Sequence, residues 1–171
     1  MILIGLGANL TSPVYGPPQA TVLAALSAIE DGAVRIVARS PLYRSAPVPA
    51  SDQPWFVNAV ARLETKHNPL ELLEYLRAIE ARFGRVRERR WGARVIDLDL
   101  LAYDDLVIGH PAADSAEAAL IVPHPRLVER LFVLRPLADV APGWRHPITG
   151  DTPKEIINKI DFLSEVVPVE A

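Results

Sequence analysis

The segment from Phe56 to Thr65 constrains the fold more than any other part of the sequence, because its side chains alternate in character along its whole length. Successive side chains of a β-strand point to opposite faces of a sheet, so the alternation predicts a strand. Phe56 and Asn58 are therefore expected to point the same way. One face would carry the small and branched apolar residues Val57, Ala59, Ala61 and Leu63, and the other would carry Phe56, Asn58, Val60 and Arg62.

Strand and helix patterns on both sides of this segment predict the fold class. Apolar residues at helical spacing mark the helices, and short alternating or continuous apolar runs mark the strands. In chain order the segments are a strand at 2–7, a helix at 18–32, a strand running from 34 toward 43, the strand at 56–65, a helix at 69–84 and a strand at 95–103. This order is typical of an α+β protein with a ferredoxin-like βαββαβ antiparallel sheet and helices on one face.

The C-terminal part of the chain predicts additional elements beyond that sheet. Apolar spacing from Arg126 to Arg135 predicts a helix that ends before Pro136, and Thr152 begins a shorter helix. No linker or internal repeat interrupts the sequence, and 171 residues suit one domain. We therefore predict a single domain over residues 1–171.

The charged residues are distributed unevenly along the chain. The net charge is −3, whereas the stretch 85–94 carries five arginines and one glutamate, so the remainder carries −7. Concentrated positive charge indicates a local anionic ligand and argues against broad nucleic-acid binding. The absence of cysteine excludes disulfides, thiolate nucleophiles and cysteine zinc sites. The sequence shows no basic leader and no apolar run of membrane-spanning length, so we predict a cytoplasmic protein without a membrane partner.

Asp97 and Asp99 form the most informative short motif. Within the strand predicted at 95–103, both carboxylates would emerge on one face, about 7 Å apart along the chain. Carboxylates at that spacing suit a hard cation such as Mg²⁺, which completes its coordination shell with water and phosphate oxygens. Taken alone, the same motif is more often an ordinary solvated strand face, with the apolar residues Ile96, Leu98 and Leu100 opposite.

The arginines upstream of this motif indicate a phosphate site. A guanidinium stays charged and forms paired hydrogen bonds to phosphate oxygens. The alternative for the stretch is a solvated helix end and loop, and Arg89 is assigned to that class. The sequence contains no P-loop, and Gly5-Leu6-Gly7 lacks the third glycine of a dinucleotide loop, so it is interpreted as a tight turn that ends a strand. Any nucleotide would therefore be held by arginines and a metal ion.

Several aromatic and polar residues are candidates for binding a flat heterocycle. Phe56, Trp91 and Phe132 could each be core residues or could stack on such a ring. Asn58 could recognise the edge of the ring, because its amide offers both donors and an acceptor. His124 lies between two prolines that fix its backbone, and by itself it is more often structural than functional.

The string from Arg90 to Asp99, Arg-Trp-Gly-Ala-Arg-Val-Ile-Asp-Leu-Asp, is highly specific. With it stand the segments Gly5 to Leu10, Tyr43 to Ser45, Asp52 to Ala59, Ile79-Glu80, Gly84 to Arg87 and Val122 to Pro125. Together these segments resemble the 6-hydroxymethyl-7,8-dihydropterin pyrophosphokinase family, and the resemblance covers nearly the whole chain. It implies transfer of pyrophosphate from ATP to a pterin alcohol in folate biosynthesis, with release of AMP.

The resemblance also implies roles for individual residues. Asp97 and Asp99 would ligate two Mg²⁺ ions that bridge the triphosphate of ATP, and Arg85 and Arg94 would steady the transferring group. ATP and a dihydropterin alcohol are thus the expected partners, with a monomer as the default state. The nucleotide side would be lined by Arg87, Arg90, His124 and Arg130. The pterin side would be lined by Ser45, Val48, Phe56, Asn58, Trp91 and Phe132.

A ferredoxin-like binding module without catalysis is the alternative from another functional class. Such folds host small-molecule sensors and RNA-binding sheets as well as enzymes. An RNA-binding sheet is expected to show exposed aromatic residues and broadly distributed basic charge. Only 6% of the residues are aromatic and the chain outside 85–94 is negative, so the sequence favours the enzyme.

Overall fold

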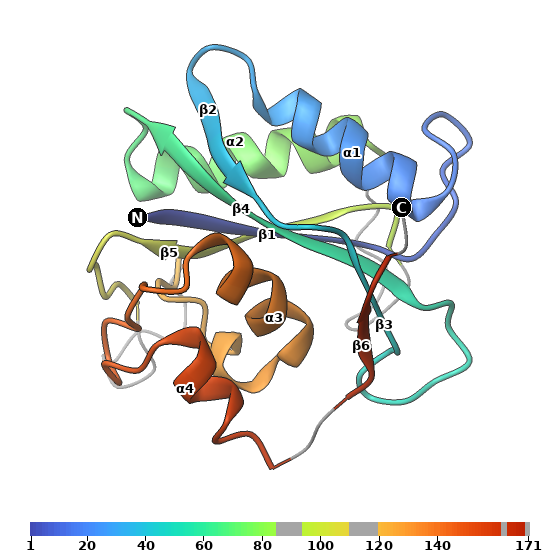
Figure 1. Cartoon of the computed structure of the whole chain (residues 1–171). Coiled ribbons are helices and arrows are strands. Elements are labelled where there is room, and N and C mark those ends of the chain that lie inside the picture. Colours follow the sequence, from blue (N-terminus) through green and yellow to red (C-terminus); the bar gives the residue numbers. More distant parts are fainter. Residues whose placement is uncertain (85–93, 110–119, 162–163, 170–171) are drawn as a thin grey trace.

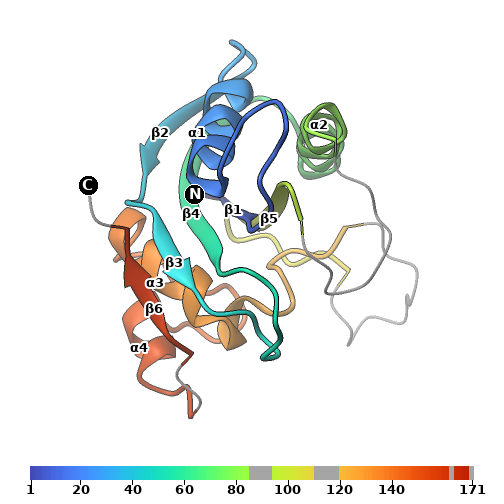
Figure 2. The same cartoon turned by 90° about the vertical axis from the view of Figure 1, so that its right-hand side faces the viewer.

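The structure is a computed structural model, and it describes residues 1–84, 94–109, 120–161 and 164–169. The strands form one antiparallel sheet in the order β5-β1-β4-β3-β6, and β2 also pairs with β4. Helices α1 and α2 lie on one side of the sheet, and α3 and α4 lie on the other (Figures 1 and 2). The predicted α+β class and ferredoxin-like arrangement are confirmed. In chain order the elements are β1 (Ile2–Ala8), α1 (Pro18–Ile29), β2 (Val34–Arg39), β3 (Tyr43–Ser45), β4 (Phe56–Thr65), α2 (Pro69–Arg82), β5 (Asp97–Tyr103), the 3₁₀ helix η1 (Leu127–Glu129), α3 (Leu131–Val140), α4 (Pro153–Ile157) and β6 (Val166–Pro168).

Strand β4 is long enough to have two partners on one edge. It pairs with β3 near its start, where Asn58 faces Tyr43, and with β2 at its end, where Thr65 faces Val34. Between these partners the Ser40 hydroxyl accepts a hydrogen bond from the backbone N–H of Val60 in β4 at 3.0 Å. The strand expected from 34 toward 43 is therefore divided in two. The opposite edge of β4 pairs with β1 from Val57 to Leu63.

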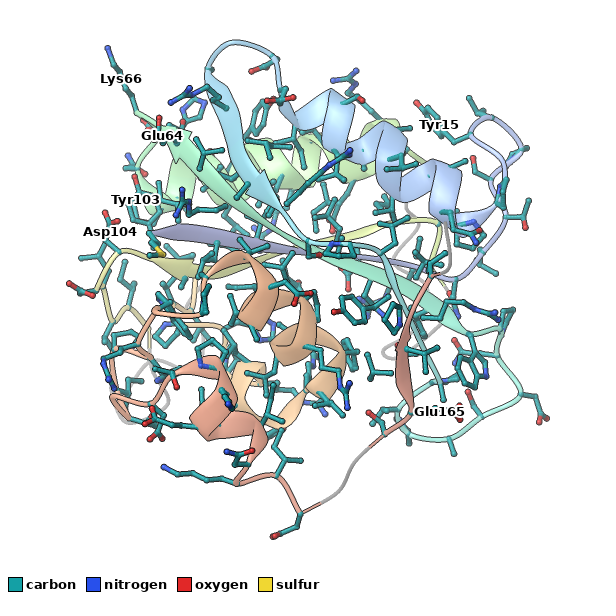
Figure 3. The ribbon with its side chains drawn as sticks, in the orientation of Figure 1. Tyr15, Glu64, Lys66, Tyr103, Asp104 and Glu165 are labelled. Carbon is teal, nitrogen blue, oxygen red and sulfur yellow. The ribbon has the colours of Figure 1, made fainter. Side chains whose placement is uncertain are left out.

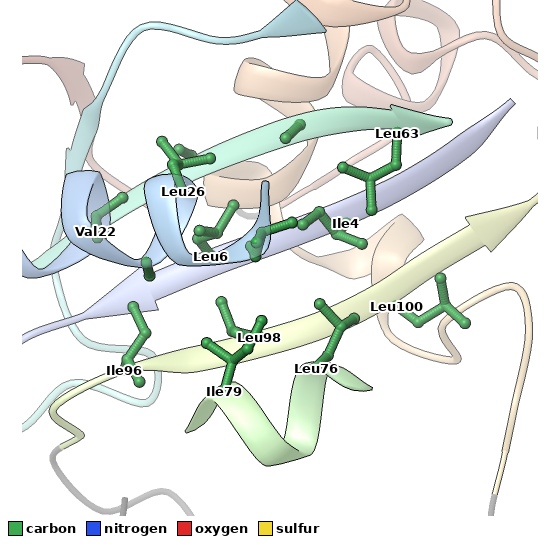
Figure 4. Packing of buried hydrophobic residues seen from close by; sticks show 14 of the residues in the cluster. Ile4, Leu6, Val22, Leu26, Leu63, Leu76, Ile79, Ile96, Leu98 and Leu100 are labelled. Carbon is green, nitrogen blue, oxygen red and sulfur yellow. The ribbon is translucent and has the colours of Figure 1, made fainter. Parts of the chain in front are cut away.

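One face of the sheet packs against α1 and α2 around a large apolar core (Figure 4). The residues of β4 predicted for one face all belong to this core, as do the apolar residues predicted for one face of β5, which confirms both alternations. Helix α2 begins with a reciprocal capping box between Asn68 and Glu71, and Gly84 follows its end with a φ of 78°. A capping box satisfies the first free N–H groups, and glycine adopts the left-handed conformation readily, so both boundaries follow from the sequence.

The opposite face of the sheet packs against α3 and α4. This second core includes Leu3 from β1, Val60 from β4, Leu101 from β5, and Leu134 and Leu137 from α3. The C-terminal elements predicted in addition to the ferredoxin-like sheet thus cover its other face. Within the part of the chain that the structure describes, the sheet therefore does not offer the open face that RNA-binding sheets use for stacking bases.

The prediction of a helix over 126–135, ending before Pro136, is wrong in its boundaries. The structure has η1 followed by α3, and Pro136 lies inside α3. Proline removes a backbone hydrogen bond and costs about 3 kcal/mol in a helix interior. Burial of one apolar side chain contributes roughly 1.5–3 kcal/mol, so a few buried side chains on both sides of the proline offset that cost. The buried residues of α3 beside Pro136 are Leu131, Val133, Leu134, Leu137 and Val140.

None of the helices in the described ranges is long and apolar enough to cross a membrane.

The two ends of the sheet have different surroundings. At one end, where Figure 3 labels Glu64, Tyr103 and Asp104, the chain's amino terminus binds the Asp104 carboxylate at 2.9 Å. At the other end β1 and β3 finish while β4 and β5 begin. Antiparallel pairing therefore brings Asn58 and Asp97 opposite the same residue of β1, Gly7, one on each side.

Candidate active site

A pocket lies at this second end of the sheet, on the face covered by α3. Its walls come from β1, β4, β5, the loop between β3 and β4, and the start of α3. The structure brings most of the predicted site residues together in it, although they come from distant parts of the chain. Those that line the pocket are Ser45, Val48, Phe56, Asn58, Arg94, Asp97, Asp99, Arg130 and Phe132. Arg85, Arg87, Arg90 and Trp91 lie outside the described residues.

Asp97 and Asp99 point into the pocket from the first half of β5. Their neighbours Leu98 and Leu100 belong to the core on the opposite face, as the alternation of a strand requires. The Asp97 side chain is 19% exposed and that of Asp99 is 34% exposed, so both are shielded but remain accessible. The pair therefore faces the pocket and does not lie on an open solvated strand face.

Positive and polar groups surround these carboxylates. The Arg94 guanidinium forms an ion pair with Asp97. One guanidinium nitrogen of Arg130 lies 3.6 Å from Asp99 Oδ2, and Nε2 of His124 lies 3.8 Å from the same oxygen. The pocket therefore combines carboxylates that could bind a cation with guanidinium groups that could bind an anion.

His124 lies beside Asp99, although it is not among the residues that line the pocket, and its imidazole is neutral. Burial, followed by the charge of nearby Arg130, lowers its pKa to about 4. Its Nδ1 accepts a hydrogen bond from the backbone N–H of Arg126 at 3.1 Å. A neutral imidazole has one acceptor nitrogen and one N–H, so the hydrogen-bond pattern assigns the proton to Nε2. Nε2 therefore cannot accept the proton of a substrate hydroxyl in this state.

The donor set around Asp97 and Asp99 fits Mg²⁺ bound to a phosphate. Two carboxylates supply hard oxygen ligands, and Mg²⁺ commonly takes its remaining ligands from water and substrate phosphates. Among the described residues no group of three or more His, Asp and Glu side chains could hold a metal by itself. The residues present thus suit an ion that arrives with a nucleotide better than an ion enclosed by protein alone.

Glu80 supports the carboxylate pair from behind, a role that is not among the sequence predictions. It lies on α2, is 2% exposed, and accepts a hydrogen bond from the backbone N–H of Leu98 at 2.6 Å. Leu98 stands between the two aspartates, so the bond fixes the backbone that orients both. Glu80 is four residues after Leu76 and three before Phe83, so it falls on the apolar face of the helix. A carboxylate on that face is the sequence signal that indicates a buried role for Glu80.

Gly5 and Gly7 form the floor of the pocket beneath the carboxylates. The interpretation of Gly5-Leu6-Gly7 as a strand-ending turn is wrong, because β1 continues through both glycines to Ala8. Gly7 faces Asp97 and Gly5 faces Asp99 in the register of β1 and β5. A Cβ on Gly7 would lie 3.3 Å from Oδ1 of Asn58, which is closer than ordinary van der Waals contact. The glycines therefore keep space open beside the carboxylates and Asn58.

The substitution Gly7→Ala is expected to weaken ligand binding without unfolding the protein. The new methyl group must displace the Asn58 amide, and loss of one good hydrogen bond costs about 1 kcal/mol, or roughly fivefold in affinity. Alanine also lowers the entropy of the unfolded chain relative to glycine, which stabilises the folded protein by about 0.4–1 kcal/mol. This gain offsets the loss of stability that the crowding causes. Calorimetric titration with a dihydropterin alcohol and a thermal melt measure both quantities. Gly143→Ala is the matched control, since nothing lies within 4 Å of its added Cβ; equal affinities in both variants would contradict the prediction.

The other end of the pocket is apolar and aromatic with one buried amide. Phe56 and Phe132 line it, and the Arg130 guanidinium lies 5.7 Å from the centre of the Phe132 ring. Nδ2 of Asn58 donates to Oγ of Ser45 at 2.8 Å, and both side chains are buried. This bond fixes the orientation of the Asn58 amide beside the aromatic rings. The pocket thus joins a charged end to an end suited to a flat heterocycle.

Comparisons with known proteins identify relatives of this chain. A family model described as 7,8-dihydro-6-hydroxymethylpterin-pyrophosphokinase matches residues 3–142. Proteins named 2-amino-4-hydroxy-6-hydroxymethyldihydropteridine pyrophosphokinase from Methylorubrum extorquens and Pseudomonas aeruginosa are similar. The first is 46% identical over 75% of this chain and 75% of its own length, and the second is 45% identical over 85% and 83%. A solved Plasmodium falciparum HPPK-DHPS chain has a TM-score of 0.68 at 15% identity; the match covers 92% of this chain but only 44% of that one, and it supports the fold alone. The chain therefore belongs to the 7,8-dihydro-6-hydroxymethylpterin-pyrophosphokinase family.

Proposed function

We propose that this protein transfers pyrophosphate from ATP to the hydroxymethyl group of 6-hydroxymethyl-7,8-dihydropterin, giving AMP and the pterin diphosphate in folate biosynthesis. The observation that carries the proposal is that one pocket joins the carboxylate pair Asp97 and Asp99 to an aromatic end containing Asn58. Membership of the pyrophosphokinase family supports the same activity. Both substrates would then meet within a single site.

The charged end of the pocket would hold the triphosphate. Asp97 and Asp99 would hold two Mg²⁺ ions, which when bound neutralise phosphate charge and fix the geometry of the chain of phosphates. Arg94 and Arg130 lie beside the carboxylates and would bind phosphate oxygens with paired hydrogen bonds. The Nε2–H of His124 adds a neutral donor on the same side. Arg85, Arg87 and Arg90 are proposed to add further positive charge from residues outside the described ranges.

The aromatic end of the pocket would hold the pterin. Phe56 and Phe132 would contact the two faces of the ring, and offset stacking of this kind is worth about 0.5–1.5 kcal/mol beyond the buried area. Asn58 would read the ring edge through its amide oxygen and its second N–H, since one N–H already donates to Ser45. Val48 and its neighbours in the loop between β3 and β4 would add backbone contacts. Trp91 is proposed to contribute from outside the described residues.

Chemistry in this site follows from positioning and charge. The hydroxymethyl oxygen attacks the β-phosphorus, the bond from that phosphorus to the oxygen bridging it to the α-phosphate breaks, and AMP leaves with the bridging oxygen. The alcohol proton passes to water or to a phosphate oxygen, because Nε2 of His124 already carries a proton. In-line placement of the two substrates converts the reaction into an effectively unimolecular one, and the arginines neutralise the charge that develops.

The products of a single incubation test this proposal. Purified protein with ATP, Mg²⁺ and the pterin alcohol is expected to form AMP and pterin diphosphate in equal amounts, measured by mass spectrometry and ³¹P NMR. A parallel incubation with excess chelator should form neither. Release of ADP would contradict pyrophosphoryl transfer. Binding of both ligands without turnover would instead favour the non-catalytic binding module.

The single domain, the monomeric state and the cytoplasmic location are further proposals. Light scattering of the purified protein and localisation of a tagged chain test the last two directly. Limited proteolysis that releases one stable fragment covering nearly all of the chain would support the first.

A further inference from the structure

We propose that Asn9 is a positioning residue that couples binding at the pterin end of the pocket to binding at the nucleotide end. The inference rests on the proposed function, because that function assigns the two ends to two substrates. Asn9 follows the last residue of β1 and is 2% exposed. It lines neither end itself, so any effect on the ligands must pass through the residues that it holds.

Asn9 binds both walls of the pocket at once. On the pterin side, its Nδ2 donates to the backbone oxygen of Pro54 at 3.1 Å and to Oε1 of Gln53 at 3.3 Å. On the nucleotide side, its Oδ1 accepts from the backbone N–H of Arg94 at 2.8 Å. The backbone N–H groups of Asn9 and Leu10 each donate to the Arg94 carbonyl oxygen at 3.1 Å. One buried amide thus joins the loop between β3 and β4 to the residue that pairs with Asp97.

The chemistry of this position calls for an amide. Its oxygen must accept one bond while its nitrogen donates two, which is the hydrogen-bonding capacity of asparagine. Aspartate has nearly the same shape and can still accept from Arg94, but it cannot donate to Pro54. Because the side chain is buried, water cannot easily replace a lost partner, and an unsatisfied group there costs about 1–3 kcal/mol.

Coupling follows from what each wall carries. The loop between β3 and β4 supplies Val48 and Gln53 to the pocket, and Arg94 supplies the guanidinium next to the carboxylates. A ligand that fixes the position of one wall therefore also favours, through the Asn9 hydrogen bonds, one position of the other wall, where the second ligand binds. The two ligands should therefore bind more tightly together than separately, and linkage requires the effect to be reciprocal.

Calorimetric titration measures this coupling. The pterin alcohol is titrated into the Mg²⁺-containing protein with and without α,β-methylene ATP, whose α–β linkage cannot be cleaved. The ratio of the two Kd values is the coupling factor, and coupling between ligand sites commonly lies at about 5-fold or more. We expect such a factor in the original protein and less than about 2-fold in Asn9→Ala. The affinity for each ligand alone should change much less than the factor does.

Three further variants separate coupling from a general loss of structure. Asn9→Asp should also lower the factor, since it keeps the Arg94 bond and loses the donation to Pro54. Gln53→Ala removes one partner from the loop side and should lower the factor partially, which keeps the test decisive even if Asn9→Ala fails to fold. The exposed Asn158 provides the matched control, and Asn158→Ala should leave the factor unchanged.

The results distinguish failure of this inference from failure of the proposed function. If the original protein forms AMP and pterin diphosphate but shows no coupling, or if folded Asn9 and Gln53 variants retain its coupling factor, the inference is overturned and the activity stands. If Asn9→Ala weakens both ligands equally with an unchanged factor, Asn9 is only structural and the inference is likewise overturned. If the original protein forms no AMP, the proposed function fails by its own assay.

Discussion

Asp97→Asn and Asp99→Asn are each expected to lower kcat by about 10³-fold or more while the protein remains folded. Each change removes a negative oxygen from the position that we assign to Mg²⁺, and an amide is a much weaker ligand for that ion. Both side chains point into the pocket and away from the core formed by Leu98 and Leu100, so neither substitution alters packing. Initial rates at several Mg²⁺ concentrations, followed as AMP formation, measure the loss.

Asp105→Asn is the matched control for these aspartate variants. Asp105 lies beyond the end of β5, is exposed, and changes the net charge by the same amount when substituted. It should retain full activity. Circular dichroism and thermal melts of all three variants verify the fold. Normal turnover in either Asp97→Asn or Asp99→Asn would remove the metal-binding role of that residue.

Arg94→Ala is expected to lower kcat about 10²- to 10³-fold, which is the usual loss when a preorganised donor to a developing charge is removed. Its guanidinium pairs with Asp97 and would contact phosphate when the nucleotide is bound. Arg94→Lys should restore only part of the rate, because an ammonium cannot form the paired hydrogen bonds of a guanidinium. Single-turnover kinetics at saturating substrates separate this loss from weaker binding.

A surface arginine provides the control for Arg94. The Arg145 side chain is 65% exposed and lies 3.7 Å from Glu155, and surface pairs of this kind contribute little. Arg145→Ala should leave kcat unchanged. An Arg94→Ala rate within about twofold of the original would show that Arg94 serves the structure of the loop and not the transferring group.

The sequence predicts the sheet well because alternation records which side chains are buried. Both faces of β4 and β5 follow from the period of two, and the boundaries of α2 follow from Asn68 and Gly84. Each of these signals is local, so a single segment contains all the information required. The division between β2 and β3 is less apparent, because it depends on Ser40 bonding to a strand that lies farther along the chain.

The errors arise where tertiary packing overrides a local rule. Pro136 normally ends a helix, but the apolar residues on both sides of it are buried against the sheet and α3 continues. Gly5 and Gly7 are usual turn residues, yet in β1 they keep the pocket floor free of side chains. Neither arrangement can be recognised without knowing what lies opposite, and for the glycines that is the pair Asp97 and Asp99.

The sequence predicts many of the residues that line the pocket, but not the residues that support its walls. The family resemblance pointed to Asp97, Asp99 and Asn58, and the structure places all three in one pocket. Asn9 and Glu80 were not assigned roles, although each makes buried hydrogen bonds that hold a wall or strand of that pocket. Supporting contacts of this kind join residues far apart in sequence, so helical spacing can mark Glu80 as a buried carboxylate but cannot show which residue it binds.

The two functions of β4 limit how the substrate preference of this protein can change. The strand carries Phe56 and Asn58 into the pocket on one face while its other face packs against α1 and α2. Inserting or deleting one residue within the strand would turn Asn58 into the core and Val57 or Ala59 into the pocket, since the side-chain period is two. New specificities must therefore come from substitutions within the strand, or from length changes in the loop at 46–55 that leave the register intact. A library built to redirect this enzyme toward other heterocycles should vary that loop in length and the strand only in composition.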